Sequence, residues 1–583
     1  MTRYSFFLIL FLACSIFAAQ SQEWLTHYEF SGYKETPRYE ATMQFSQRLA
    51  EASPFIHYTS LGKSPQGRDI AALIIDKNGN FTPEAAKQSG NAIILVEASI
   101  HAGESEGKDA GLMFIRDLII HNKFPHLLSH TTLVFIPIFN VDGHERFSPY
   151  SRINQNGPVE MGWRTTAQNL NLNRDFAKAD APEMQHWLQF FNHWLPDFFM
   201  DIHTTDGADY QYTLTYAMHT LGDMNEAQTQ WQKEYIKKFR NDLDNKGILT
   251  FPYVSFKKWH DPKSGLIEYI ASPRFSTGYG SNQNRPSLLV ETHMLKDYKT
   301  RVTAVYELLK TSIEYIDENY QSLKNINEQA DNQASQLTLK TIPLNYEISM
   351  TDSTSVVFKG IGYTIEKSEL TGGLWHKYNG QNQNFDLQLF NKQLPKDMVK
   401  LPAAYIIPAE QKTVIQRLKY HGIEYQTLKQ PQSYDIETYK FSHVKLAGFT
   451  YESHQIVENF EMEPITFKKT FPQGSIIIPV NQRSAKLIAQ LLEPQGSDSF
   501  FKWGFMNGIF EQKEYVESYV MEKKAREMIA KDPKLLNQYN QAIKENPEAY
   551  KNSYNKLQWF YKQTPYYDQE LNVYPIGRIM TLN

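Results

Sequence analysis

Apolar runs of strand length alternate with amphipathic helical stretches over residues 23–320, and this alternation strongly constrains the fold. Strands interleaved with helices favour an α/β fold, in which helices cover a largely parallel or mixed sheet. The strand-like runs lie at residues 70–75, 92–97, 132–139, 197–202 and 288–291, and the helical stretches at 105–121, 182–194, 225–245 and 302–319. Because ligands bind at the carboxyl ends of strands in such sheets, a functional site is expected there.

Two histidines and a glutamate follow two of these strand ends. His101 and Glu104 lie three residues apart just past the run at 92–97, and His203 follows the run at 197–202. Imidazole nitrogen and carboxylate oxygen bind zinc, and three protein ligands with a fourth position left to water are typical of a catalytic zinc. A single histidine is more often structural than a ligand, but the three residues together predict one catalytic Zn²⁺ per chain.

Glu291 ends the apolar run at 288–291 and is a candidate general base. Burying a charged residue at the end of a strand costs on the order of several kcal/mol unless the charge pairs with another group. A charge that is kept there without such a pair indicates a catalytic role. A carboxylate beside an activated water could take its proton and pass it to a leaving amine. The simpler alternative is a strand-end carboxylate that caps a helix or pairs with a surface lysine.

Two arginines are candidates for binding oxygen anions. The pair Asn173-Arg174 lies in a polar segment, where the arginine fork could bind a free C-terminal carboxylate and the Asn amide could add a donor. Arg164 follows Trp163 and could stabilise an oxyanion that develops during catalysis. Taken alone, each arginine is more often part of a surface salt bridge.

This ordered set of motifs resembles the zinc carboxypeptidases, metallopeptidase family M14, over roughly residues 35–320. The motifs, in chain order, are Gly67-Arg68, His101-x-x-Glu104, Asn140–Gly143, Trp163-Arg164, Asn173-Arg174, His203 and Glu291. The resemblance implies a three-layer α/β/α sandwich on a mixed, mostly eight-stranded sheet. It also implies zinc ligands His101, Glu104 and His203, oxyanion stabilisation by Arg164, carboxylate binding by Asn173 and Arg174, and general base catalysis by Glu291.

One position departs from the pattern of the family. Many members have Asp two residues before the Asn of the Asn-Arg pair, where it orients the first histidine ligand, but this chain has Asn171. The Asn171 carbonyl can still accept the imidazole N–H of His101, as a weaker partner from outside the set of ligands.

The family also has a mobile tyrosine over the substrate, upstream of the base, and two residues of this chain are candidates. Tyr269 has the spacing typical of the digestive members of the family. Tyr279 is flanked by Gly278 and Gly280, which favour a flexible loop, and it is the preferred candidate. The residues that would contact the cleaved side chain lie in the same loop, at about residues 272–281.

Composition changes beyond residue 320. Residues 326–340 are polar and are predicted to be a linker between a catalytic domain at 23–325 and an accessory domain at 341–583. The accessory domain has strand-like runs such as 355–358, 404–408 and 474–479 and two short helical stretches, 410–420 and 484–492. It is predicted to be mixed and β-rich, and it has no cluster of ligand-type residues that would indicate a role.

The N-terminus has the pattern of a secretory signal peptide at residues 1–22, with Arg3 before a short apolar run. The mature chain is therefore expected to be exported, to the periplasm or outside the cell, without a membrane span. Cys14, the only cysteine, lies in this segment, so catalysis by a thiol is excluded for the mature chain, and lipoprotein anchoring through Cys14 is a less favoured alternative. The formal net charge of −4 gives no indication of a nucleic-acid partner.

These observations predict an exported metallocarboxypeptidase that cleaves the C-terminal peptide bond of peptides, with a zinc-activated water and Glu291 as general base. Its partner is a peptide with a free C-terminal carboxylate. The first alternative is a peptidase of cell-wall peptides, including γ-glutamyl bonds, or a deacylase of N-acyl amino acids at the same zinc site. The second is a non-catalytic peptide- or glycan-binding protein, which would be expected to have lost a ligand or the base.

Overall fold

The structure is a computed structural model that describes residues 24–222 and 224–581. The predicted signal peptide at residues 1–22, together with Cys14, lies outside the described residues.

Eight strands form one mixed sheet in the spatial order β1-β2-β4-β3-β5-β10-β6-β7. In sequence order they are β1 Ile56–Lys63, β2 Asp69–Ile75, β3 Ala92–Ala98, β4 Thr131–Ile136, β5 Phe198–Thr205, β6 Leu214–Met218, β7 Thr250–Pro252 and β10 Ser287–His293. The central strands β4, β3, β5 and β10 run parallel, whereas the β1–β2, β2–β4 and β10–β6 pairs are antiparallel. The mixed eight-stranded sheet predicted from the sequence is confirmed.

The central strands are buried on both faces, which explains why they read as continuous apolar runs. Successive side chains of a strand point to opposite faces of the sheet. Ile93 and Leu95 of β3 therefore pack in one hydrophobic core, whereas Ile94 and Val96 pack in a second core on the other face.

Helices cover both of these faces, as the α/β/α prediction requires. On the first face, α7 (Pro182–Trp194) packs Trp187 and Phe191 against Phe199 of β5. The second face is covered by α5 Glu106–Ile115, α8 Glu226–Asn245 and α10 Tyr298–Glu318. The other helices of this part are α2 His27–Phe30, α3 Tyr39–Ala52, α4 Pro83–Ser89, α6 Val141–Glu145, α9 Ser276–Asn282, the π-helix η1 Arg116–Ile120 and the 3-10 helix η2 Leu172–Arg174.

The prediction of a linker at residues 326–340 was wrong, because most of this segment is helical. Helix α11 spans Tyr320–Ser335 and buries Leu323, Ile326, Ala330 and Ala334. These residues recur at intervals of three and four positions and so form one face of the helix. Two of the four are alanines, so the apolar stripe is weak in the sequence although it is buried in the fold.

The region after α11 is rich in β-strands, arranged in three further sheets. A two-stranded sheet pairs β11 (Thr341–Ile348) with β14 (Gln393–Lys400). A six-stranded sheet has the order β16 Gln426–Thr427, β19 Ile476–Pro479, β15 Ala404–Ile407, β20 Gly577–Ile579, β17 Gln432–Leu446 and β18 Val457–Phe471.

The remaining sheet crosses the predicted domain boundary. It joins β8 (Ser255–Lys258) and β9 (Asp261–Ile267) to the long hairpin of β12 (Thr354–Lys367) and β13 (Leu374–Phe390). Leu389 and Phe390 of β13 pair with Leu266 and Ile267 of β9. One hydrophobic core also extends from the main sheet into the later region. The two parts therefore share both hydrogen bonds and buried surface.

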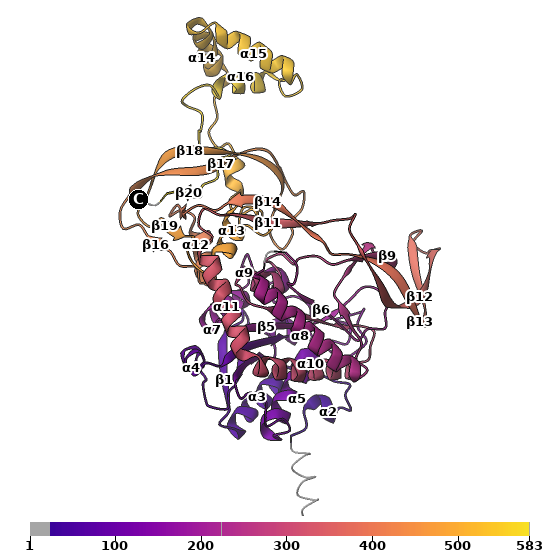
Figure 1. Cartoon of the computed structure of the whole chain (residues 1–583). Helices are drawn as coiled ribbons and strands as arrows, with labels where there is room; N and C mark the ends of the chain where they lie inside the picture. The colour runs from indigo at the N-terminus through magenta and orange to yellow at the C-terminus, as the bar shows by residue number, and fades with distance from the viewer. Residues whose placement is uncertain (1–23, 223, 582–583) are drawn as a thin grey trace, which may run out of the picture.

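Helices α12 (Lys412–Tyr420) and α13 (Ala485–Leu492) pack in this shared core. The short 3-10 helix η3 (Asn507–Phe510) precedes a group of three helices that projects from the rest of the molecule (Figure 1). These are α14 Ser518–Lys531, α15 Lys534–Glu545 and α16 Ser553–Tyr561. Within the described residues, none of the helices has the length and apolar character needed to cross a membrane.

Candidate active site

The three predicted zinc ligands meet at the carboxyl ends of two neighbouring parallel strands. His101 and Glu104 follow β3, and His203 lies near the end of β5, which pairs with β3. His203 Nδ1 lies 3.2 Å from His101 Nδ1 and 3.0 Å from Glu104 Oε2. One ligand atom from each residue lies within 4.8 Å of the others, and all three residues are buried. Two imidazole nitrogens and a carboxylate are a donor set that suits zinc.

The other ring nitrogen of each histidine meets an acceptor that fixes the orientation of the ring. His101 Nε2 lies 3.2 Å from Asn171 Oδ1, which is the contact that the sequence analysis predicts. His203 Nε2 lies 2.8 Å from Asp201 Oδ2. These contacts hold the protons on Nε2 and direct both Nδ1 atoms toward Glu104. Burial also lowers the pKa of His101 to about 4, which favours the neutral imidazole that a metal ion binds.

The predicted catalytic and binding residues line one cavity with these ligands. The cavity has a volume of about 320 Å³. Its walls include all three zinc ligands together with Arg164, Asn173, Arg174 and Glu291. These positions are separated by up to 190 residues in the sequence, and the fold brings them together because each lies at a strand end or in a loop on the same edge of the sheet.

Glu291 lies on β10 directly opposite His203 of β5. Its side chain lines the cavity, yet the residue is only 7% exposed. Burial raises the pKa of Glu291 to about 8, and the charges of Glu104 and Asp201 add to this shift while His203 opposes it. A carboxyl group with a raised proton affinity, next to a metal site, has the character expected of a general base.

The cationic and amide groups occupy a second wall of the cavity. Arg164 Nη1 lies 3.7 Å from Glu104 Oε1, beside the zinc ligands. Asn173 and Arg174 belong to η2, and the Asn173 Oδ1 atom is buried without a hydrogen-bond partner among the described residues. The Arg174 guanidinium lies over the ring of Phe275, 4.7 Å from its centroid. An acidic ligand group would therefore meet donors here.

The assignment of Tyr279 as the tyrosine over the substrate was wrong. Tyr279 is fully buried in the core, where its ring packs against Phe176, Trp187 and Phe191. Its hydroxyl group accepts a hydrogen bond from Gln283 Nε2 at 2.9 Å.

The glycines beside Tyr279 serve close packing, not a mobile loop. A Cβ atom at Gly278 would overlap the Ser272 carbonyl oxygen, and a Cβ atom at Gly280 would overlap the Ser287 hydroxyl oxygen. Both glycines lie in helix α9, which their small size allows to approach its neighbours.

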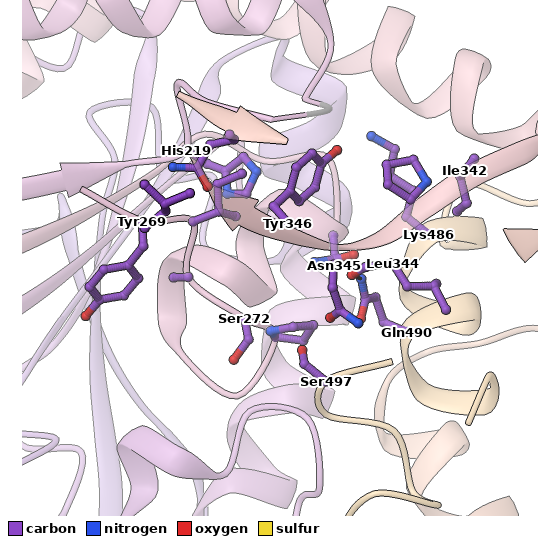
Figure 2. Close-up of a pocket in the computed structure, with 17 residues that line it drawn as sticks. His219, Tyr269, Ser272, Ile342, Leu344, Asn345, Tyr346, Lys486, Gln490 and Ser497 are labelled. Atoms are coloured by element: carbon purple, nitrogen blue, oxygen red, sulfur yellow. Dashed lines mark hydrogen bonds between the residues drawn. The ribbon is translucent and has the colours of Figure 1, made fainter. Parts of the chain in front are cut away.

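Tyr269, the less favoured candidate, has the position that the prediction gave to Tyr279. It is 47% exposed and lines the cavity of the zinc ligands. Tyr269 and Ala271 also line a neighbouring cavity of about 260 Å³, to which Asn345 and Lys486 of the later region contribute (Figure 2). The segment at 269–273 thus lies between the two cavities, and Tyr269 borders both.

Sequence reasoning missed four residues that contact the site. Asp201 lies two positions before His203, so the strand period that directs both side chains to one face could have indicated it. Arg152 Nη2 lies 2.8 Å from Glu104 Oε1. Tyr451 and Glu452 lie in the accessory region and contact Arg174 and Asn171 respectively. No local pattern marks these last three residues, because each contact joins distant parts of the chain.

Comparison with known proteins agrees with this geometry. A family model described as zinc carboxypeptidase matches residues 42–415, which extends past the span of the resemblance seen in the sequence. "Carboxypeptidase 2" of Trichophyton rubrum is 21% identical over 503 residues, covering 82% of this chain and 86% of that protein. "Carboxypeptidase 2" of Trichophyton equinum is 22% identical over 501 residues, covering 82% and 85%.

Solved structures of carboxypeptidases also match part of the chain. The carboxypeptidase A of Helicoverpa armigera matches with a TM-score of 0.38 and 16% identity, covering 49% of this chain and 75% of that chain. A metallo-carboxypeptidase from Burkholderia cenocepacia matches with a TM-score of 0.37 and 18% identity, covering 48% and 69%.

Proposed function

Because the chain belongs to the zinc carboxypeptidase family, we propose that it hydrolyses the C-terminal peptide bond of peptides, with Glu291 as the general base. The observation that carries this proposal is the cavity that Arg174 and Asn173 share with the zinc ligands and Glu291. A donor pair for a carboxylate, held at a fixed place relative to a hydrolytic centre, selects the last peptide bond of a chain.

His101, Glu104 and His203 would hold the metal ion. Bound zinc would supply a Lewis acid that polarises the scissile carbonyl and makes water a better nucleophile. The residues of the chain supply the positioning and the proton transfers.

The Arg174 guanidinium and the Asn173 side chain bind the terminal carboxylate, which places the scissile bond beside Glu291. The Glu291 carboxylate accepts a proton from the attacking water and returns it to the leaving amine nitrogen. Arg164 donates a hydrogen bond to the carbonyl oxygen as that oxygen gains negative charge. Tyr269, at the mouth of the cavity, is positioned to cover the bound residue.

A panel of N-blocked dipeptides tests this proposal. We expect the free acids to be hydrolysed, the C-terminal amides to be hydrolysed at least 100-fold more slowly, and the activity to disappear with a chelator and return with zinc. This factor corresponds to a lost charge-assisted contact of about 3 kcal/mol. Activity that survives complete removal of the metal would contradict the mechanism.

The same panel separates the alternative substrates at this zinc site. Muropeptides, γ-glutamyl peptides and N-acyl amino acids are assayed beside the dipeptides at matched concentration. If one of these classes is hydrolysed faster than the dipeptides, that class would replace ordinary peptides as the proposed substrate. The roles of the site residues would stay unchanged. A zinc content near zero in the purified protein would instead favour a non-catalytic binding protein.

We also propose that the protein is exported, through the signal pattern of residues 1–22. Fractionation of cells that express the full chain, with N-terminal sequencing of the product, tests this. Recovery of the uncleaved chain in the cytoplasm would contradict it. A lipid-modified N-terminal cysteine would instead support anchoring through Cys14.

A further inference from the structure

A tight turn of the accessory region reaches the edge of the active site. It joins β17 to β18 and consists of residues 451–454. Tyr451 N donates to His454 O at 2.9 Å, and His454 N donates back to Tyr451 O at 3.0 Å. The two central residues, Glu452 and Ser453, both have positive φ angles, of 48° and 68°. Non-glycine residues adopt this conformation at a cost, which persists only where the surrounding structure maintains it.

Two contacts hold this turn against the catalytic part of the chain, and a third anchors it within the accessory region. His454 Nε2 lies 2.7 Å from Asp180 Oδ2, and the ring of Tyr451 stacks on the buried Trp503. Glu452 Oε2 accepts a hydrogen bond from the backbone N–H of Asn171 at 3.3 Å. The turn is therefore fixed on both sides of η2, the short helix that contains Asn173 and Arg174.

The Tyr451 hydroxyl group contacts the arginine itself. Arg174 Nε donates a hydrogen bond to the Tyr451 hydroxyl oxygen at 3.2 Å, and Arg174 Nη1 donates to the Asn173 carbonyl oxygen at 2.7 Å. Within the described part of the chain, Nη2 has no hydrogen-bond partner. Because Nε and Nη1 are both held, the guanidinium plane is fixed, and Nη2 remains available to a ligand in the cavity that Arg174 lines.

We infer that Tyr451 of the accessory region is a positioning residue for substrate recognition, because it fixes the Arg174 guanidinium in the orientation that binds the terminal carboxylate. This inference rests on the proposed function, in which Arg174 binds that carboxylate. It gives the accessory region a part in substrate recognition, because the region supplies the side chain that orients the recognition arginine. An arginine that must be ordered on binding loses affinity, whereas one that is already held does not.

Tyr451→Phe tests the inference, since it removes the hydroxyl group and keeps the ring that stacks on Trp503. For free-acid dipeptides we expect KM to rise about 5- to 20-fold while kcat changes less than about 2-fold. The full loss of a hydrogen bond to a charged group corresponds to about 12- to 160-fold, and the expected rise is smaller because Arg174 keeps its bond to the Asn173 carbonyl oxygen. Loss of an orienting contact made equally in the ground and transition states has this signature. The slow hydrolysis of C-terminal amides should not change, because those substrates lack the carboxylate.

The matched control is Tyr434→Phe. Tyr434 lies on the same strand, β17, and is half-buried, but it packs in a different core away from the turn. Its kinetic constants should equal those of the wild type. A KM for Tyr451→Phe within about 1.5-fold of the wild type, or an equal rise for acids and amides, would overturn the inference.

A double-mutant cycle with Arg174→Lys makes the result independent of any general destabilisation. Lysine has no Nε donor for the Tyr451 hydroxyl group, so Tyr451→Phe should raise KM in the wild-type background but not in the Arg174→Lys background. Equal effects in both backgrounds would show that Tyr451 acts through stability and would refute its positioning role. If the wild-type enzyme itself does not prefer free acids to amides, the proposed function fails and the inference fails with it.

Discussion

The substitution Asp201→Asn tests whether Asp201 increases the affinity for zinc, separately from any effect on the stability of the fold. Asp201 Oδ2 accepts a hydrogen bond from His203 Nε2 at 2.8 Å, and both residues are at most 1% exposed. Asparagine keeps the shape of the side chain and an oxygen acceptor, but it removes the negative charge. The bond to His203 then changes from a charge-assisted contact to a neutral one.

The expected loss of zinc affinity follows from that change. Hydrogen bonds to charged groups contribute about 1.5–3 kcal/mol and neutral ones about 0.5–1.5 kcal/mol, so the difference is about 1–1.5 kcal/mol. This corresponds to a roughly 5- to 13-fold weaker binding of zinc, near the lower end of the 10- to 100-fold range for removing such partners.

The stability of the metal-free protein should change less than its affinity for zinc. Glu97 of β3 pairs with Asp201 of β5 in the sheet register, and Glu97 is fully buried. Burial raises the pKa of Glu97 well above its ordinary value, and the charge of Asp201 raises it further. Asp201→Asn relieves this repulsion, but it also weakens the contact through which Asp201 raises the pKa of the buried His203. Because the two effects oppose each other, the melting temperature of the metal-free variant should stay close to that of the wild type.

Both quantities are measured on protein stripped with a chelator, by zinc titration against a chromophoric competitor and by thermal unfolding. Asp206→Asn is the matched control, since Asp206 lines the cavity at the end of the same strand but is exposed and does not contact a ligand. Its zinc affinity should change less than about 3-fold, as expected for a screened charge. Unchanged affinity in Asp201→Asn, or an equal loss in Asp206→Asn, would refute the reasoning.

Four further changes test other parts of the structure. Glu291→Gln should lower kcat by about 10²- to 10⁴-fold with an unchanged zinc content, and a variant that keeps full activity would exclude Glu291 as the base. Tyr279→Phe should lower the free energy of unfolding by about 1–3 kcal/mol, because it removes the buried hydroxyl group that contacts Gln283 Nε2 and His421 Nδ1, and it should leave KM and kcat unchanged. Tyr269→Phe should instead change KM or kcat and leave the free energy of unfolding unchanged. A chain that ends at residue 340 should be insoluble or should melt far below the full chain, because it lacks β13 and the later half of a continuous core; cooperative unfolding at the temperature of the full chain would contradict this.

Much of the site was predictable because its residues stand at strand ends. His101, His203 and Glu291 each follow or end an apolar run, and a polar residue in that context is conspicuous in the sequence. Their meeting depends on β3, β5 and β10 being parallel neighbours, which the helices between the strands favour. The zinc ligands could therefore be identified before their distances were known.

The errors share a physical cause, which is that one sequence signal has two structural meanings. Gly278 and Gly280 suggested a mobile loop, but glycine also permits close helix packing, and only the neighbours of α9 decide between these roles. The polar segment at 326–340 suggested a linker, but Ala330 and Ala334 suffice to bury one face of α11 because their neighbours pack closely.

The sequence by itself determined the α/β class, the zinc ligands and four further side chains of the catalytic cavity, those of Arg164, Asn173, Arg174 and Glu291, because strand period, burial and ligand chemistry act over a few neighbouring residues. Only the tertiary structure decided that Tyr269 borders the cavity, that β13 extends a sheet begun by β8 and β9, and that Tyr451 holds Arg174. Arg174 and Tyr451 are 277 positions apart. A contact across that separation depends on the packing of every intervening element, and no short stretch of sequence contains it.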